Sequence, residues 1–174
     1  MKQKGLIIVN TGNGKGKTTA ALGLCMRALG HKFRVCVLQF IKGSWKYGEL
    51  DAFKTVSDSV DFHVLGKGFL WDEPNEAENK RIATQAWEFA KSKIQSNHYD
   101  LIVLDEITYL MNFRLISEQE VIQVITQQKE NQHIVITGRE ASDQLIQCAD
   151  IVTEMKEIKH AFSQGIKAQK GIEF

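Results

Sequence analysis

The segment TGNGKGKTTAALG, residues 11–23, has the composition of a loop that binds polyphosphate. The formal phosphate-loop pattern is G-x-x-x-x-G-K-[ST], and the segment matches it except at the first position, where threonine replaces glycine. Glycines let backbone N–H groups turn toward an anion, a lysine neutralises phosphate oxygens, and a threonine hydroxyl can ligate Mg²⁺. We therefore expect ATP or a close relative to bind here. The expected binding residues are Thr11, Gly12, Asn13, Gly14, Lys15, Gly16, Lys17, Thr18 and Thr19.

A second apolar run ends in two carboxylates. The segment LIVLDE, residues 101–106, closes with Asp105 and Glu106. In phosphate-loop enzymes an acid at the end of another strand helps to hold Mg²⁺. We therefore expect Thr18, Asp105 and Glu106 to form a site for Mg²⁺, with Mn²⁺ as an acceptable substitute. Arg139 follows a third run, in TGR, and either reaches a phosphate or the leaving group, or makes an ion pair at the surface.

Short apolar runs alternate with longer segments of helical periodicity, and these elements must position the side chains above. The runs predicted as strands are 5–10, 33–40, 60–65, 100–105, 133–138 and 150–155. The segments predicted as helices are 17–30, 77–96, 118–130 and 141–148. Several strands are apolar on both faces, as in a parallel sheet covered by helices. The alternation predicts an α/β fold of the P-loop NTPase (RecA-like) type, with a mostly parallel sheet flanked by helices and ligands at the carboxyl ends of the strands.

Two of the predicted helices carry further local signals. Ser117 and Glu120 have the spacing of a capping box at the start of 118–130. The helix 77–96 has an apolar stripe made of Ala83, Trp87, Ala90 and Ile94. Residues 41–59 and 66–76 are less regular and hold glycines and large aromatic residues, which either contact substrate or close the core.

The composition limits the classes of function. The chain has 174 residues, of which 43% are hydrophobic, so we expect one domain that covers residues 1–174. A net charge of +1 argues against a broad nucleic-acid surface. No apolar run approaches the ~18 residues of a membrane span. The three cysteines form no CxxC pair, so we expect buried thiols in a reducing compartment, the cytoplasm.

Segments spread over nearly the whole chain resemble one family of enzymes. They are TGNGKGKTTAALGLCMRALGH, VLQFIKG, GKGFLW, LIVLDEITYL, VITGR, CADIVTEM and the tail KHAFSQGIKAQKGIEF, and they occur in the family order. Together they resemble the corrinoid adenosyltransferases of the CobA/BtuR/CobO type. The tail is especially specific, because generic ATPases have no reason to end in this way.

The resemblance implies an unusual reaction of ATP. Members of this family transfer the 5′-deoxyadenosyl group of ATP to Co(I) of a corrinoid such as cob(I)alamin, and the whole triphosphate leaves, in cobalamin biosynthesis or salvage. The attacked atom is the ribose C5′, so the phosphate loop would hold the leaving group. The triphosphate would lie in the loop in the reverse sense to ordinary phosphate-loop enzymes. The nucleophile is the metal of the substrate, so no serine, cysteine or histidine nucleophile is required.

The resemblance also implies roles for single residues and for partners. Lys17 would stabilise the departing triphosphate, and Glu106 would help to place Mg²⁺ or the ribose. Phe69 and Trp71 match the aromatic pair of the G-x-G-F-x-W segment, which is implicated in displacing the lower axial ligand of the cobalt. Leu70, between them, stands where many relatives have threonine. The family further implies a homodimer and a reduced flavodoxin-type electron donor. Some relatives carry an N-terminal extension before the first strand that can cover the active site, so we expect solvent exclusion to differ here.

Two other classes of function stay open from the residues alone. An ATP-hydrolysing switch or motor would use Glu106 to activate water and would release phosphate. A non-enzymatic carrier of corrinoids or nucleotides would release no product. The intact Gly16-Lys17-Thr18 and Asp105-Glu106 argue against a carrier, because storage does not need Mg²⁺ chemistry. The three classes therefore differ in what they release: triphosphate, phosphate or nothing.

Overall fold

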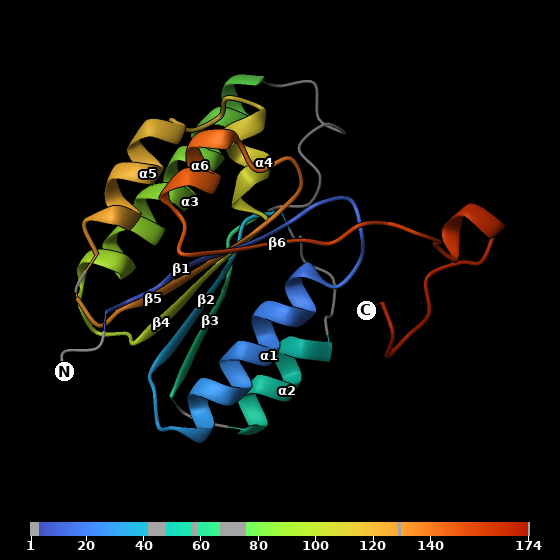
Figure 1. The fold of residues 1–174 in the computed structure, drawn as a ribbon, viewed down its shortest axis with the longest axis horizontal. Helices are drawn as coiled ribbons and strands as arrows, with labels where there is room; N and C mark the ends of the chain where they lie inside the picture. Colours follow the sequence, from blue (N-terminus) through green and yellow to red (C-terminus); the bar gives the residue numbers. More distant parts are fainter. Residues whose placement is uncertain (1–3, 42–47, 57–58, 67–75, 129, 174) are drawn as a thin grey trace.

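The structure is a computed structural model that describes residues 4–41, 48–56, 59–66, 76–128 and 130–173. Six strands form one sheet in the order β3-β2-β4-β5-β1-β6, and each paired strand runs parallel to its neighbour (Figure 1). They are β1 (Ile7–Thr11), β2 (Val35–Gln39), β3 (Val60–Val64), β4 (Leu101–Asp105), β5 (His133–Thr137) and β6 (Ile151–Glu154). Because the strands share one direction, their carboxyl ends meet at the same edge of the sheet.

Helices cover both faces of this sheet (Figure 1). One face carries α1 (Lys17–Gly30) and α2 (Gly48–Val56). The other carries α3 (Glu76–Gln95), α4 (Ile107–Asn112), α5 (Glu118–Thr126) and α6 (Asp143–Cys148). The inner strands β2 and β4 are buried at every position because they are covered on both faces. This α/β arrangement is consistent with the P-loop NTPase fold that the sequence predicts.

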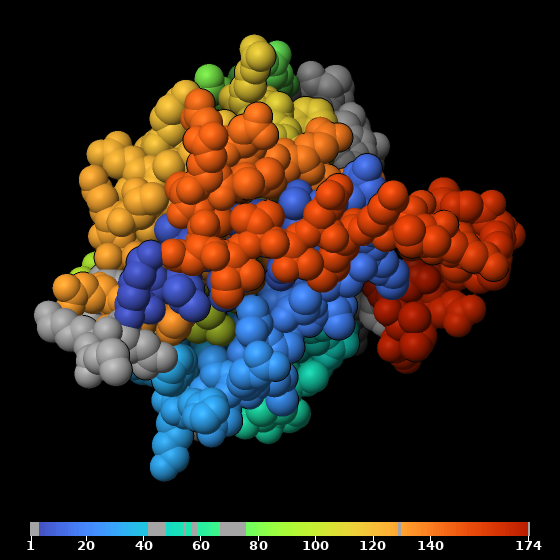
Figure 2. Space-filling view, viewed as in Figure 1, coloured from blue at the N-terminus to red at the C-terminus, as the bar shows by residue number. Residues whose placement is uncertain are grey.

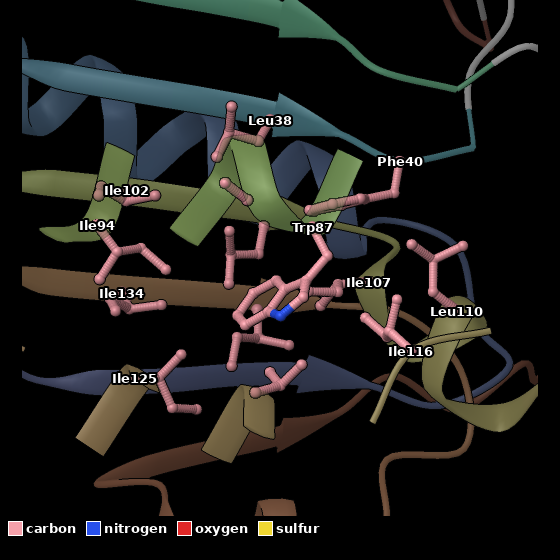
Figure 3. Packing of buried hydrophobic residues seen from close by; sticks show 14 of the residues in the cluster. Leu38, Phe40, Trp87, Ile94, Ile102, Ile107, Leu110, Ile116, Ile125 and Ile134 are labelled. Carbon is pink, nitrogen blue, oxygen red and sulfur yellow. The ribbon is translucent and has the colours of Figure 1, made fainter. Parts of the chain in front are cut away.

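The core consists of two apolar clusters, one on each face of the sheet. The larger cluster lies under α3 and α5, where Trp87 is surrounded by isoleucine and leucine side chains (Figure 3). The predicted apolar stripe of α3 is confirmed, since all four of its members are buried. The smaller cluster lies under α1 and includes Cys25 and Phe53. Cys36 is buried like Cys25, whereas Cys148 is only partly buried.

All six predicted strands are confirmed. The predicted helix 17–30 is present with the predicted ends, and the other three predicted helices are present with shifted ends. The helix that begins at Glu118 ends at Thr126, four residues before the predicted end. Its N-cap is Ser117, whose Oγ accepts from the Glu120 N–H, whereas the Glu120 carboxylate accepts from Lys91 of α3 at 2.7 Å. Two short helices were not predicted, α2 within the less regular segment 41–59 and α4 directly after β4.

Beyond β6 the chain leaves the body of the molecule, as the red segment in Figures 1 and 2 shows. This tail, residues 155–173, is mostly exposed and contains a single 3₁₀ turn, Phe162–Gln164. Its end returns toward α1 and α2 (Figure 1). Among the described helices none has the length and apolar character needed to cross a membrane.

Candidate nucleotide site

The phosphate loop connects the end of β1 to the start of α1. Gly16 is the N-cap of α1 and has a φ of 110°, a left-handed conformation that favours glycine. Lys17 is only 6% exposed, and its Nζ donates to the carbonyl oxygens of Gly12 and Gly14, each at 2.8 Å. The lysine therefore lies folded inside the loop, with its charge at the centre of the turn.

The glycines at 12 and 14 are also needed for a reason that lies outside the loop. A Cβ at Gly12 would lie 2.5 Å from the Met155 carbonyl oxygen, and one at Gly14 would lie 2.6 Å from the same atom. The Gly14 N–H donates to this oxygen at 2.6 Å. Because the chain beyond β6 packs against the loop this closely, the amide of Gly14 holds the loop to Met155 in place of facing an anion.

Asp105 lies at the carboxyl end of β4 and is 1% exposed. Its Oδ1 accepts from the hydroxyls of Thr18 at 2.8 Å and Thr137 at 2.7 Å, and its Oδ2 accepts from the Gln39 amide at 3.0 Å. The structure therefore brings the predicted metal-binding pair, Thr18 and Asp105, into direct contact across the sheet edge. The described hydrogen-bond donors to this carboxylate are all neutral groups.

Glu106 follows Asp105 in a left-handed conformation, with φ 62° and ψ 27°. Such a conformation costs a non-glycine residue roughly 1–2 kcal/mol. The Glu106 N–H donates to the Thr137 hydroxyl at 2.9 Å, and Glu106 is the N-cap of α4. This turn carries the chain from a buried strand into the helix, and it places Glu106 on the wall of the same cavity as the phosphate loop.

Charges around the loop act on Lys17. Burial lowers the pKa of Lys17 below its usual value, while the nearby Glu106 and Asp105 carboxylates raise it and Arg139 lowers it further. Arg139 is exposed, and its carbonyl oxygen accepts from the Thr108 hydroxyl at 2.8 Å. The predicted Arg139 thus lies within electrostatic range of the phosphate loop, and its backbone ties the end of β5 to α4.

A cavity of about 440 Å³ lies over the phosphate loop. Its walls come from the loop and α1, from the start of α2, from Glu106 and from the tail. The lining residues are Lys15, Gly16, Lys17, Thr18, Thr19, Gly48, Glu49, Glu106, Gly171, Ile172 and Glu173. Lys15 Nζ lies 3.8 Å from Glu173 Oε2, so a carboxylate of the tail faces a cation of the loop. A larger cavity, of about 670 Å³, lies between α3, α4 and α5 and contains none of the predicted site residues.

The donor set suits a hard cation. Within the described part of the chain no three or more His, Cys, Asp and Glu side chains gather as a metal-binding group. The available ligands are instead a hydroxyl and carboxylates, the oxygen donors that Mg²⁺ binds together with water and substrate phosphates. Thr18, Asp105 and Glu106 therefore fit a cation that arrives with a polyphosphate.

Some predicted residues lie elsewhere or outside the description. The Thr11 hydroxyl accepts from the Ala141 N–H at 3.1 Å and so points toward the α6 side of the sheet. Asn13 is exposed in the loop. The predictions for Phe69 and Trp71 fall in 67–75, outside the described residues.

The sequence reasoning missed three contributors to this site: Gln39, Thr137 and the wall formed by 171–173. Gln39 and Thr137 end apolar strands, as Asp105 does, and a polar residue at that place in VCVLQ and HIVIT was the available signal. For the wall formed by 171–173 the signal in the sequence was weaker, namely that the tail is typical of one enzyme family. No local pattern shows that residues so far along the chain return to the loop.

The whole chain is similar to a family of known proteins. The family model "ATP:corrinoid adenosyltransferase BtuR/CobO/CobP" matches residues 3–174. The corrinoid adenosyltransferase of Escherichia coli (strain K12) is 40% identical over 172 residues, which cover 99% of this chain and 87% of that protein. The corrinoid adenosyltransferase of Sinorhizobium sp. is 44% identical over 174 residues, covering 99% and 81%. Corrinoid adenosyltransferase CobA of Salmonella typhimurium (strain LT2) is 39% identical over 173 residues, covering 99% and 87%.

Proposed function

The chain belongs to the ATP:corrinoid adenosyltransferase family and is a transferase of that kind, and from this premise we propose how its residues carry out the reaction. The electron pair of Co(I) in the corrinoid substrate attacks C5′ of ATP. The bond from C5′ to the triphosphate oxygen breaks, and triphosphate leaves with that electron pair. One Co–C bond replaces one C–O bond, and the reaction needs no protein nucleophile.

The observation that carries this proposal is the position of the family-typical tail. Gly171, Ile172 and Glu173 line the same cavity as Lys17 and Thr18. A nucleotide-binding loop shared by many ATPases thus meets a segment that generic ATPases lack. This juxtaposition supports an acceptor other than water at the nucleotide.

The phosphate loop stabilises the leaving group. Lys17 and Lys15 supply positive charge to a triphosphate that gains charge as the C–O bond breaks. Thr18, Asp105 and Glu106 would hold Mg²⁺, which would add charge stabilisation. Glu106 lies on the cavity wall and would help to place the metal or the ribose. Arg139 contributes a further positive charge from the end of β5.

The corrinoid side of the site rests on the family resemblance. Phe69 and Trp71 would replace the lower ligand of the cobalt with apolar surface, which favours reduction of Co(II) to Co(I). A reduced flavodoxin-type protein supplies the electron, and the enzyme works as a homodimer in the cytoplasm. We take residues 1–174 as one functional domain, because loop, strand ends and tail contribute to one cavity.

An anaerobic assay with ATP, Mg²⁺ and chemically reduced cob(I)alamin tests the function. We expect a light-sensitive adenosylated corrinoid and triphosphate in equal amounts, followed through the cobalt spectrum and by separation of the phosphate products. Release of inorganic phosphate without a spectral change would support the ATP-hydrolysing alternative. The Lys17→Ala variant is the control, and it should lose almost all use of ATP.

A further inference from the structure

Four neighbouring strands carry a polar side chain at or next to their last residue, on the face covered by α1. Gln39 pairs in register with Asp105, and Asn10 pairs with Thr137. These residues follow, two positions later, apolar residues of the cluster beneath α1, so they share the α1 face of the sheet. A polar row therefore crosses β2, β4, β5 and β1 just below the phosphate loop.

Gln39 is the member of this row whose side chain contacts Asp105 through an amide. It is 1% exposed, and its Nε2 donates to Asp105 Oδ2 at 3.0 Å. Its Oε1 is buried and has no hydrogen-bond partner among the described residues. An unsatisfied buried polar group costs about 1–3 kcal/mol, and an apolar side chain would avoid that cost. The strand therefore retains an amide at a place where stability alone favours a hydrocarbon.

The contact with Asp105 supplies the reason. Thr18 and Thr137 both donate to Oδ1, and Gln39 is the described donor to Oδ2. With both oxygens held, the carboxylate plane is fixed, and so is the acceptor that orients the Thr18 hydroxyl. An amide holds Oδ2 without adding a positive charge. A lysine or arginine at the same place would cancel the negative charge of the carboxylate.

We propose that Gln39 is a positioning residue for the metal–triphosphate substrate, acting through the Asp105 carboxylate on the Thr18 hydroxyl. The proposal rests on the metal site described under the proposed function. Without the Gln39 amide, only Oδ1 of Asp105 is still held, by Thr18 and Thr137. The carboxylate can then turn about these contacts, and Thr18 no longer presents its oxygen in one fixed direction. The loss falls on Mg²⁺-dependent binding, whereas the contacts of Lys17 and the loop with phosphate persist.

The chain offers a matched control in Gln132. It is also a glutamine that is 1% exposed, and its Nε2 donates to the Tyr99 carbonyl at 3.1 Å. Within the described part of the chain its Oε1 has no hydrogen-bond partner. It directly precedes β5, at the opposite edge of the sheet from Asp105. Gln39→Met and Gln132→Met thus remove the same group from equivalent burial, and only the first faces Asp105.

The test measures ATP affinity by calorimetry with and without Mg²⁺, together with the melting temperature. In Gln39→Met we expect the tightening of ATP binding by Mg²⁺ to fall about 10-fold or more, as for other groups that orient metal ligands. Affinity for Mg²⁺-free ATP should stay unchanged. Gln132→Met should keep the full Mg²⁺ effect, whatever its melting temperature. If Gln39→Met keeps it as well, the positioning role is wrong.

A second variant decides the matter if Gln39→Met does not fold. Gln39→Asn keeps an amide but is one methylene shorter, so its Nδ2 should not reach Asp105 Oδ2. Its Mg²⁺ effect should fall as in Gln39→Met. A full Mg²⁺ effect in this variant contradicts the proposal. If the unchanged protein shows no Mg²⁺ effect at all, the proposed metal site fails, which is a separate outcome from failure of Gln39.

Discussion

At the scale of single residues, the buried Lys17 sets a limit on the pH range of the enzyme. Burial is the main cause that lowers the pKa of this lysine below the usual 10.5. The folded free enzyme therefore loses this proton before the unfolded chain does, so the contribution of Lys17 to stability rises with pH between the two values. The charge needed to bind triphosphate is lost over the same interval.

We therefore expect kcat/KM for ATP to fall at alkaline pH with a midpoint below that of an exposed lysine. The measurement is a pH profile at saturating corrinoid, because kcat/KM for ATP then reports ionisations of the enzyme form to which ATP binds. Lys17→Ala should be about 10²–10³-fold slower and should lack this alkaline limb. A midpoint at or above 10.5 would mean that burial does not govern this group.

The cysteines give a second prediction at this scale. Burial raises the pKa of the Cys25 and Cys36 thiols to about 12 in each case. Near pH 8 almost no thiolate is present at either residue, and thiolate is the reactive form. We expect a thiol-specific reagent to leave both unmodified in the native protein and to reach the partly buried Cys148 slowly. Mapping of the modified peptides checks this, and labelling of Cys25 at the rate of Cys148 would contradict it.

The aromatic pair gives a third prediction, which rests on the family resemblance. Changing both Phe69→Ala and Trp71→Ala should spare activity on chemically reduced Co(I) more than activity that starts from Co(II). The reason is that displacement of the lower ligand matters for reduction of the cobalt and not for attack on C5′. Rates measured from the two starting states of the corrinoid decide the matter, and equal losses would end the ligand-displacement role.

At the scale of elements, Gly138 determines how closely α4 approaches the end of β5. Its φ is 145°, and a Cβ there would lie 1.9 Å from the Thr108 hydroxyl oxygen. Thr108 is 1% exposed and cannot swing into solvent. We expect Gly138→Ala to destabilise the protein by about 1–3 kcal/mol and to lower activity, because α4 and the Glu106 turn must shift.

Chemical denaturation of matched variants tests this packing. Gly23 lies within α1, where an added Cβ meets nothing within 4 Å, so Gly23→Ala should stabilise by roughly 0.5–1 kcal/mol. Adding Thr108→Ala to Gly138→Ala removes the nearest atom and should recover part of the loss. Equal stability of the two glycine variants would contradict the close approach.

The same elements explain which parts of the fold could be predicted. Strands such as LIVLD and HIVIT are apolar on both faces, and only a covered parallel sheet buries such a run, so their prediction was reliable. The helix Ile107–Asn112 was missed because six residues are too few to show helical periodicity and because four of them are buried. Within the site, a local pattern identified Lys17 and Asp105. The contact of Gln39 with Asp105 depends on β2 lying next to β4 in the sheet. No short sequence pattern shows this strand order.

At the scale of the whole molecule, the tail contributes more to the site than to the fold. Its residues are mostly exposed, yet Gly171, Ile172 and Glu173 form one wall of the nucleotide cavity. The Lys15–Glu173 pair, at 3.8 Å with Lys15 half exposed, is worth at most about 1 kcal/mol of stability. Loss of the tail should therefore leave the sheet and both apolar clusters intact.

Removal of residues 158–174 should consequently change the melting temperature by only a few degrees while lowering adenosyl transfer at least tenfold. The reason is that the cavity over the phosphate loop loses a wall and admits water around the triphosphate. The Glu173→Gln variant removes the negative charge but keeps a side chain of the same size in the cavity wall. Its ATP affinity should stay the same or tighten, because a carboxylate no longer competes with the triphosphate for Lys15. Melting curves, calorimetry with ATP and the cobalt spectrum measure the three quantities. If the truncated protein keeps the full rate of transfer, the tail has no role in the reaction. If the truncated protein fails to fold, the tail is needed for the stability of the fold.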